Sequence, residues 1–356
     1  MLSLSTPLPI VFALVFAPAE EQPEERSDLE STIDSLAAPL LEEQALGLVL
    51  GVRTPQARVV RGFGRVAFDD QRVPDGDTVF EIGSVTKVFT GLLLADAIER
   101  GRASLDDPIE RHVPEGVDVC DDEGPVTLRH LVTHTSGLPR MPENFVPRSL
   151  AEPYADYDAA ALHAYLADFV LENEPGSTYA YSNLGSGLLG ELMGRAHGAA
   201  GYEEALRERI FVPLGLEDTT ITLDERLGAR FADAAVSNTE AAHAWEFDAL
   251  AGCGAIRSTV NDLLRFGEAQ LETEGPLAAS IARSHERLFD GRPPVAYGWH
   301  LSADGKSIWH NGQTGGFHGW LSVNLETGVV VAALSNGGAG HRVDGVAQQV
   351  AAAAGG

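Results

Sequence analysis

The sequence predicts an α/β protein of the α+β type, in which one mostly antiparallel sheet is built from both chain ends and is flanked by helices. Two observations lead to this fold class. Short β-type runs lie near both ends of the 356-residue chain, and helical patterns with Pro and Gly punctuation fill residues 120–250 between them. Strands from the two ends pair most economically in a single sheet, with the middle of the chain packed beside it as a helical subdomain.

The N-terminal part is predicted to carry a helix, a hairpin and a second helix. Residues 28–44 follow a helical pattern, and the β-rich runs 45–52 and 57–64 are separated by a short Thr-Pro turn, which predicts a hairpin. Residues 85–100 show the strongest helical pattern, which ends at Gly101. Because this helix is apolar on most of its faces, we expect it to be central and buried.

The C-terminal part returns to strands after one more predicted helix at residues 263–271. The β-type runs are residues 297–301, 306–310, 320–325 and 329–335. We therefore expect one folded domain over residues 35–345. Its sheet part covers about 35–80 and 255–345, its helical part covers about 105–250, and residues 346–356 form a tail. A cleft between the two parts is the expected ligand site.

The first residues resemble an export signal. Residues 1–19 carry no charged side chain, and Ala17-Pro18-Ala19 has the small-x-small pattern of a signal-peptidase site. We interpret residues 20–34, which begin with an acidic run, as a linker. This pattern predicts a periplasmic or extracellular protein. In such a compartment Cys120 and Cys253 are candidates for a disulfide, although their spacing does not decide whether they pair.

The charge balance excludes several classes of partner. The chain has 52 Asp and Glu against 25 Lys and Arg, which gives a net charge of −27. Nucleic acids and anionic membrane surfaces attract dense positive charge, so neither is an expected partner. No later segment approaches 18 continuous apolar residues, so we expect no membrane span. A small molecule or a short peptide is the expected substrate, and the oligomeric state is left open.

The first chemical pattern is Ser84-Val85-Thr86-Lys87, at the start of the predicted central helix. Residues three apart lie on the same face of a helix, so the hydroxyl of Ser84 and the amine of Lys87 can meet. A serine hydroxyl needs a base within hydrogen-bond reach to act as a nucleophile, and a lysine in a buried position can be that base. The helix N-terminus also favours developing negative charge. A helix-capping serine with an incidental lysine is the alternative.

Two further segments complete the predicted site. Tyr181-Ser182-Asn183 follows a Pro-Gly turn, so Tyr181 can accept or relay the Ser84 proton and the Asn183 amide can orient Lys87 or bind a substrate carbonyl. Residues 310–316 lie between two strand runs. There Gly312 allows close approach, the backbone N–H of Gln313 can pair with that of Ser84 as an oxyanion hole, and His310 can hold a substrate anion.

Taken together, these segments resemble the class C serine β-lactamases and the related DD-peptidases, D-aminopeptidases and esterases of the penicillin-recognising fold. The resemblance covers roughly residues 35–340 and rests on five segments: residues 80–87 (FEIGSVTK), 127–139 (TLRHLVTHTSGLP), 175–177 with 181–183, 251–254 with 258–263, and 310–317. It implies a serine acyl-enzyme with Ser84 as nucleophile, Lys87 as its base or proton partner, Tyr181 as second general base and Asn183 as substrate-orienting amide. It implies no metal and no organic cofactor.

The third segment departs from the family pattern. β-Lactamases of this family commonly have Lys-Thr-Gly where this chain has His310-Asn311-Gly312. A lysine is cationic at pH 7 and a histidine is mostly neutral, so a substrate carboxylate loses a fixed positive partner there. A β-lactamase-like hydrolase of amide, lactam or ester carbonyls is our first prediction. The alternatives are a carboxylesterase, a D-amino-acid peptidase and a penicillin-binding sensor without turnover.

Two other patterns are interpreted as structural. Residues 185–190 match GxGxxG, but no parallel β-α-β pattern surrounds them, so we expect small-residue helix packing rather than a dinucleotide site. His130 and His134 are four residues apart, as in a helical zinc site, but no third ligand is evident. We expect them to help hold the loop at residues 135–137.

Overall fold

The computed structural model describes residues 22–43, 45–120, 124–171, 173–337 and 340–355, so the predicted signal segment lies outside the described residues. The predicted antiparallel sheet from both chain ends is confirmed. It has six strands in the order β2-β1-β10-β9-β8-β7, and every neighbouring pair is antiparallel. The strands are β1 (Ala45–Arg53), β2 (Arg58–Gly64), β7 (His300–Leu301), β8 (Ser307–Gln313), β9 (Phe317–Asn324) and β10 (Val330–Gly337).

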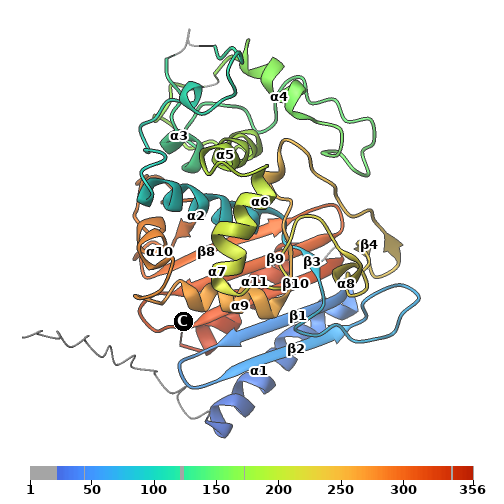
Figure 1. Cartoon of the computed structure of the whole chain (residues 1–356). Coiled ribbons are helices and arrows are strands. Elements are labelled where there is room, and N and C mark those ends of the chain that lie inside the picture. Colours follow the sequence, from blue (N-terminus) through green and yellow to red (C-terminus); the bar gives the residue numbers. More distant parts are fainter. Residues whose placement is uncertain (1–21, 44, 121–123, 172, 338–339, 356) are drawn as a thin grey trace, which may run out of the picture.

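Both faces of this sheet are covered by helices (Figure 1). Successive side chains of a strand point to opposite faces, and the two hydrophobic clusters follow this alternation. Leu48 and Leu50 of β1 belong to the cluster with α1 (Pro23–Glu43) and α11 (His341–Ala353), whereas Val49 belongs to the cluster with α2 (Thr86–Glu99) and α9 (Val260–Ala269). The N-terminal and C-terminal helices therefore lie together on one face, and the predicted central helix lies on the other side.

Two predicted segments at the chain ends are corrected by these helices. Residues 23–34, expected as a linker, form the first half of α1, which buries Leu29, Ile33, Ala37 and Leu40 at helical spacing. Residues 346–353, expected as part of a tail, belong to α11, which buries Val343, Val346, Ala347 and Val350 in the same cluster. Each helix covers apolar sheet surface, and this burial stabilises both segments.

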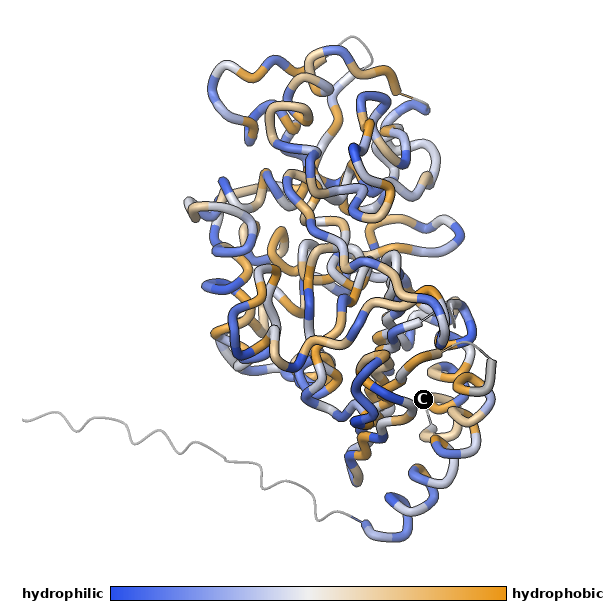
Figure 2. The backbone as a smooth tube through the Cα atoms, turned by 90° about the vertical axis from the view of Figure 1, so that its right-hand side faces the viewer, coloured by the Kyte–Doolittle hydropathy of each residue, from blue (hydrophilic) through white to orange (hydrophobic). Residues whose placement is uncertain are grey.

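The helical part lies beside the sheet, and the central helix α2 lies between the two. Among the residues of α2 that are buried are Lys87 and Asp96, so the prediction of a central buried helix is confirmed. Figure 2 shows from the side that the helical part lies at one end of the molecule and α1 at the other. The helices of this part and the elements that follow it are α3 (Leu128–Val132), α4 (Ala159–Leu166), α5 (Asn183–Ala196), α6 (Tyr202–Leu206), α7 (Val212–Leu214), α8 (Glu225–Gly228), α10 (Ala278–Ser284), β4 (Ala235–Ser237) and β5 (Glu240–Ala241).

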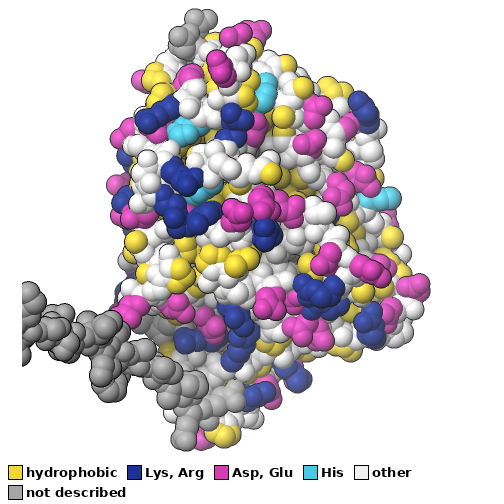
Figure 3. Space-filling model, viewed as in Figure 1, with side chains coloured by type: hydrophobic (Ala, Val, Ile, Leu, Met, Phe, Trp, Pro, Cys, Tyr) yellow, Lys and Arg dark blue, Asp and Glu magenta, His cyan; other side chains and the backbone are white. Residues whose placement is uncertain are grey.

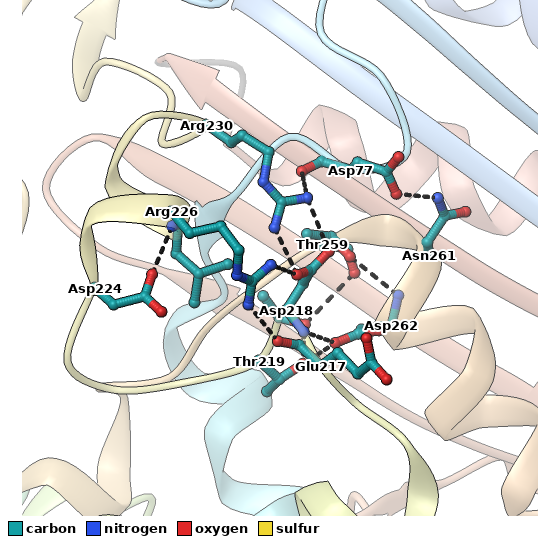
Figure 4. A network of polar contacts seen from close by, with 12 residues as sticks. Asp77, Glu217, Asp218, Thr219, Asp224, Arg226, Arg230, Thr259, Asn261 and Asp262 are labelled. Atoms are coloured by element: carbon teal, nitrogen blue, oxygen red, sulfur yellow. Dashed lines mark hydrogen bonds and ion pairs between the residues drawn. The ribbon is translucent and has the colours of Figure 1, made fainter.

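A small second sheet and a polar network join the helical part to the main sheet. β3 (Phe80–Glu81) pairs with β6 (Arg257–Ser258), directly before the Ser84 turn and directly before α9. In the network of Figure 4, Asp218 binds the guanidinium groups of Arg226 and Arg230. The Asp262 carboxylate accepts hydrogen bonds from the Asp218 N–H and the Thr219 hydroxyl, both at 2.8 Å. These contacts tie the chain near α8 to the first turn of α9.

The surface carries charges of both signs. On the face shown in Figure 3, acidic side chains are dispersed with Lys and Arg side chains between them. Cys120 is half-buried and Cys253 is buried, and both are free thiols, so the possible disulfide between them is not formed. Among the helices within the described residues, none combines the length and the apolar character needed to cross a bilayer.

Candidate active site

Ser84 lies in a single 3₁₀ turn, Gly83–Val85, that joins β3 to α2. The sequence predicted Ser84 at the start of the central helix, and the structure places it in this turn, two residues before α2 begins at Thr86. Gly83 has a φ of +51°, which an L side chain rarely adopts, so glycine suits this sharp turn. The predicted spacing still holds, because the Lys87 side-chain nitrogen lies 3.1 Å from the Ser84 hydroxyl. Ser84 is partly exposed and can be reached by a substrate.

Lys87 is buried and held by three oxygen atoms. Its side-chain nitrogen contacts the Ser84 hydroxyl, the Asn183 amide oxygen at 3.0 Å and the backbone carbonyl of Cys253 at 2.7 Å. The residue is only 2% exposed. The three oxygen atoms surround the nitrogen, so each of its hydrogen-bonding positions has a partner. The Asn183 amide therefore contacts Lys87, as the sequence predicted.

The end of β8 lies against the Ser84 turn. A Cβ atom at Gly312 would stand 2.0 Å from the Ile82 carbonyl oxygen and 2.8 Å from the Ser84 nitrogen. Gly312 therefore permits close packing of strand and turn, rather than the close approach of a substrate that the sequence suggested. The strand also continues through Gln313, three residues beyond the predicted end at His310.

The Gln313 N–H points away from β9. Thr314 donates its N–H to the Phe317 carbonyl, which closes the β8–β9 hairpin with a hydrogen-bonded pair. Hydrogen-bonded and non-hydrogen-bonded pairs alternate in antiparallel sheets, so the next pair, Gln313 with His318, is non-hydrogen-bonded. The Gln313 N–H is thus not used by β9, and a Cβ atom at Gly83 would stand only 2.6 Å from the Gln313 nitrogen, so this backbone group lies beside the Ser84 turn. The backbone N–H groups of Ser84 and Gln313 therefore lie close together.

Tyr181 lies in the loop directly before α5. Its ring stacks on His134 at 4.4 Å between centroids, and the Lys87 nitrogen stands 4.8 Å from the ring centroid. Ser182 caps α5 by accepting the Gly185 N–H at 2.9 Å and donates its own hydroxyl proton to the Pro139 carbonyl. This capping fixes Tyr181 and Asn183 on either side of Ser182 beside Lys87.

His310 is buried behind this cluster. It is 1% exposed, its ring stacks on His300 at 4.8 Å, and it lies 6.4 Å from the Tyr181 ring. Burial lowers the pKa of His310 well below its usual value, and burial lowers the pKa of His300 to about 4. Both imidazoles are therefore neutral at pH 7. His310 does not line the cleft described below, so its burial does not support the predicted contact with a substrate anion.

The cleft in front of Ser84 has a volume of about 400 Å³. Of the predicted site residues it is lined by Ser84, Asn183 and Gln313. Four further lining residues belong to the segments that carry the family resemblance: Cys253, Gly254, Thr314 and Gly315. The others were not selected as site residues: Arg140, Tyr154, Trp245 and Phe247. Tyr154 stacks on Phe247 at 4.5 Å and contacts Trp245, so these aromatic rings form one wall. They come from distant loops without a local pattern, and no sequence signal marked them. The sequence left two loops as expected walls of the cleft, and of these residues 140–175 supply Arg140 and Tyr154, whereas residues 275–295 supply no lining residue.

The two patterns interpreted as structural have packing roles. A Cβ atom at Gly187 or Gly190 would stand 2.7 Å from Leu250 or from the backbone of Gly252, so these glycines allow α5 to pack closely, as predicted. His134 lies beyond the end of α3 with a φ of +58°, so it and His130 do not share one helix face. His130 accepts the Thr127 N–H and His134 accepts the Ser182 N–H, both through Nδ1.

This fold and this cluster define a class of protein, the β-lactamase family, and the chain belongs to it. The family model described as "Beta-lactamase" matches residues 30–355. The match confirms the resemblance predicted from the five sequence segments.

Two individual proteins are similar to this chain in sequence. D-alanyl-D-alanine-carboxypeptidase/endopeptidase AmpH of Escherichia coli (strain K12) is 32% identical over 232 residues, which cover 65% of this chain and 58% of AmpH. The matched region thus spans less than two thirds of that relative. Penicillin-binding protein 4 of Amycolatopsis lactamdurans is 30% identical over 286 residues, covering 74% of this chain and 73% of that protein.

Solved structures show the same fold. The β-lactamase/D-alanine carboxypeptidase from Yersinia pestis, complexed with citrate, superimposes with a TM-score of 0.79 at 26% identity, covering 91% of this chain and 98% of that one. A class C β-lactamase superimposes with a TM-score of 0.81 at 21% identity, covering 92% and 98%. The second likeness concerns the fold alone.

Proposed function

We propose that the protein is a β-lactamase-like serine hydrolase that cleaves amide, lactam or ester carbonyls through an acyl-enzyme on Ser84. The observation that carries this proposal is the 3.1 Å contact between the Lys87 nitrogen and the Ser84 hydroxyl at the edge of an open cleft. A nucleophile in direct contact with a buried amine is the arrangement that activates serine in the absence of a histidine base. Membership of the β-lactamase family supports the same chemistry.

In the proposed mechanism, the Ser84 oxygen attacks the substrate carbonyl carbon and loses its proton to Lys87 or Tyr181. The oxyanion that forms accepts hydrogen bonds from the backbone N–H groups of Ser84 and Gln313. Such donors lower the barrier by about 3–4 kcal/mol each in comparable sites. The proton then passes to the leaving group as it departs. Water, deprotonated by the same groups, attacks the acyl-enzyme, releases the acid and restores the hydroxyl of Ser84.

Among the candidate activities, we rank a β-lactamase-like amidohydrolase first. Relatives that are named β-lactamases support this label, and a D-alanyl peptidase is the second candidate because AmpH and penicillin-binding protein 4 are among the similar proteins. A carboxylesterase and a sensor without turnover use the same site. Export to the periplasm or the outside remains a prediction from residues 1–19. In the proposed mechanism, Gly312 supports the oxyanion hole by allowing β8 to pack against the Ser84 turn.

A parallel assay tests the proposal. A chromogenic cephalosporin, a p-nitrophenyl ester and a D-Ala-D-Ala peptide are given to the wild-type protein and to Ser84→Ala. We expect turnover of at least one substrate and its loss in the variant by several orders of magnitude, because the attacking oxygen is absent. Turnover that survives Ser84→Ala contradicts the assignment. A penicillin adduct that persists on Ser84 for hours without turnover supports the sensor instead.

A further inference from the structure

Arg140 is a cation in the cleft whose charge no acid balances. It is exposed, it follows the Gly137-Leu138-Pro139 turn, and it lines the cleft together with Ser84 and Asn183. Among the residues that the structure describes as lining this cleft, it is the one with a charged side chain. No carboxylate within the described ranges forms an ion pair with its guanidinium. Most of the described arginines do pair with an acid, as Arg148 does with Asp156 and Arg257 does with Glu246.

The backbone holds Arg140 in a fixed place relative to the proposed nucleophile. Its carbonyl oxygen accepts the N–H groups of Asn183 and Leu184, at 3.0 and 3.2 Å. The loop that carries Arg140 is therefore attached to the start of α5, whose Asn183 binds Lys87. The guanidinium carbon also stands 5.2 Å from the centroid of the Tyr181 ring, and a cation in that position is attracted by the ring.

The other candidate for a positive charge at this site does not supply one. His310 occupies the place at which many β-lactamases carry a lysine, but it is 1% exposed and stacked on His300. Lys87 is buried, and its nitrogen is already surrounded by three oxygen atoms of the protein. A substrate anion in the cleft is thus left with the free N–H groups of Arg140, whose planar fork suits a carboxylate.

We propose that Arg140 is a specificity-determining residue that binds a carboxylate of the substrate, so the protein prefers anionic acyl compounds to neutral ones. The inference rests on the proposed hydrolase function of this cleft. It places the anion-binding cation on the wall formed by the helical part, beside Asn183, rather than on β8. Arg140 takes no part in proton transfer and acts by holding the substrate.

Matched ester pairs test this role. The first pair is p-nitrophenyl hemiglutarate and its methyl ester, which differ by a carboxylate on the acyl side. The second pair is 4-acetoxybenzoate and its methyl ester, which differ by a carboxylate on the leaving group. For each pair, kcat/KM of the anionic ester is divided by that of the neutral ester, and the pair that responds to Arg140 identifies the side on which the carboxylate lies.

Three variants are compared with the wild type. In Arg140→Gln we expect the anionic-to-neutral ratio to fall by about tenfold or more in at least one pair, mainly through KM. Arg140→Lys should restore part of that ratio, because it restores the charge. Arg148→Gln removes a cation from the same loop region, where the Arg148 side chain is 89% exposed, and should leave the ratio unchanged. Added salt should lower the wild-type ratio and not that of Arg140→Gln.

The outcomes separate this inference from the proposed function. If the wild type hydrolyses the esters and Arg140→Gln keeps both ratios, the role of Arg140 is overturned while the hydrolase remains. If the wild type hydrolyses none of them, calorimetry with the anionic esters decides, using Ser84→Ala with and without Arg140→Gln. Binding that disappears with Arg140 supports the inference. Equal binding, or no binding to Ser84→Ala, overturns it.

Discussion

Gly312 shows how a single missing side chain shapes the proposed active site. The space that its Cβ atom would need is occupied by the Ile82 carbonyl oxygen and the Ser84 nitrogen. These are backbone atoms of a buried turn, and they cannot move aside as the end of a flexible side chain can. The absence of a Cβ atom therefore allows β8 to lie against the turn that carries Ser84, and it brings the Gln313 N–H to the nucleophile.

At this residue, Gly312→Ala should damage activity more than a change of one methyl group suggests. Displacing β8 from the turn removes one oxyanion donor from its position, so we expect kcat to fall by about 100-fold or more and the protein to lose stability. Steady-state kinetics and thermal unfolding measure the two effects. Gly345→Ala in α11 is the matched control, since a Cβ atom there meets no atom within 4 Å. Equal kinetics for the two variants would show that the close packing at Gly312 is unimportant.

At the scale of elements, α9 is anchored through its first turn. Thr259 caps this helix by accepting the Asp262 N–H at 3.1 Å, and the Asp262 carboxylate then binds the Asp218 N–H and the Thr219 hydroxyl. Asp262 is 7% exposed, and burial raises its pKa. The position of this carboxylate near a helix N-terminus is favourable for a negative charge. One side chain thus joins the chain before α8 to the helix that covers the main sheet.

The anchoring role predicts a loss of stability in Asp262→Ala. The substitution leaves the buried Thr219 hydroxyl and the Asp218 N–H without this acceptor, and each such loss costs about 1–3 kcal/mol. We expect the free energy of unfolding in urea to fall by about 2–4 kcal/mol. Asp290→Ala removes a carboxylate with an 86% exposed side chain and should change it by less than about 0.5 kcal/mol. Similar effects of the two substitutions would refute the anchor.

At the scale of the whole molecule, a buried acid makes stability depend on pH. Glu81 lies in β3, is 2% exposed, and accepts the Trp245 N–H at 2.7 Å, with Arg257 at 3.6 Å. Burial raises the pKa of Glu81 from 4.5 to about 7, against the opposing effects of hydrogen bonds and Arg257. Between these two values the unfolded chain has lost the proton that the folded protein keeps. The free energy of unfolding therefore falls as pH rises through this range, and the loss is complete above pH 7.

The size of this loss follows from the two pKa values and is roughly 3 kcal/mol. We expect Glu81→Gln, which cannot ionise, to gain stability relative to the wild type between pH 5 and pH 8. Thermal or urea unfolding at both pH values measures the difference. Glu246→Gln removes the exposed partner of the same arginine, and its difference from the wild type should not change in this way. A constant difference for Glu81→Gln would show that Glu81 is ionised throughout.

The sequence was sufficient where a local pattern carries the information. The hairpin of β1 and β2 and the buried helix α2 follow from residue periodicity, because burial repeats with the period of the element. The contact between Ser84 and Lys87 follows from a spacing of one helical turn. These features depend on residues that are close along the chain.

Tertiary structure decided the rest, because it depends on contacts between distant segments. The C-terminal helix α11 became part of the fold because it covers apolar sheet surface next to α1. The Cys253 carbonyl contacts Lys87 although the two residues are 166 positions apart. Because this contact uses a backbone atom, the identity of the side chain gives no sign of it. Arg140 and the aromatic wall of the cleft came from loops without periodicity. The sequence alone thus determined the elements with a clear periodicity and the chemical groups of the site. Only packing decided which of these groups face the substrate, since exposure is a property of the folded surface and not of any short segment.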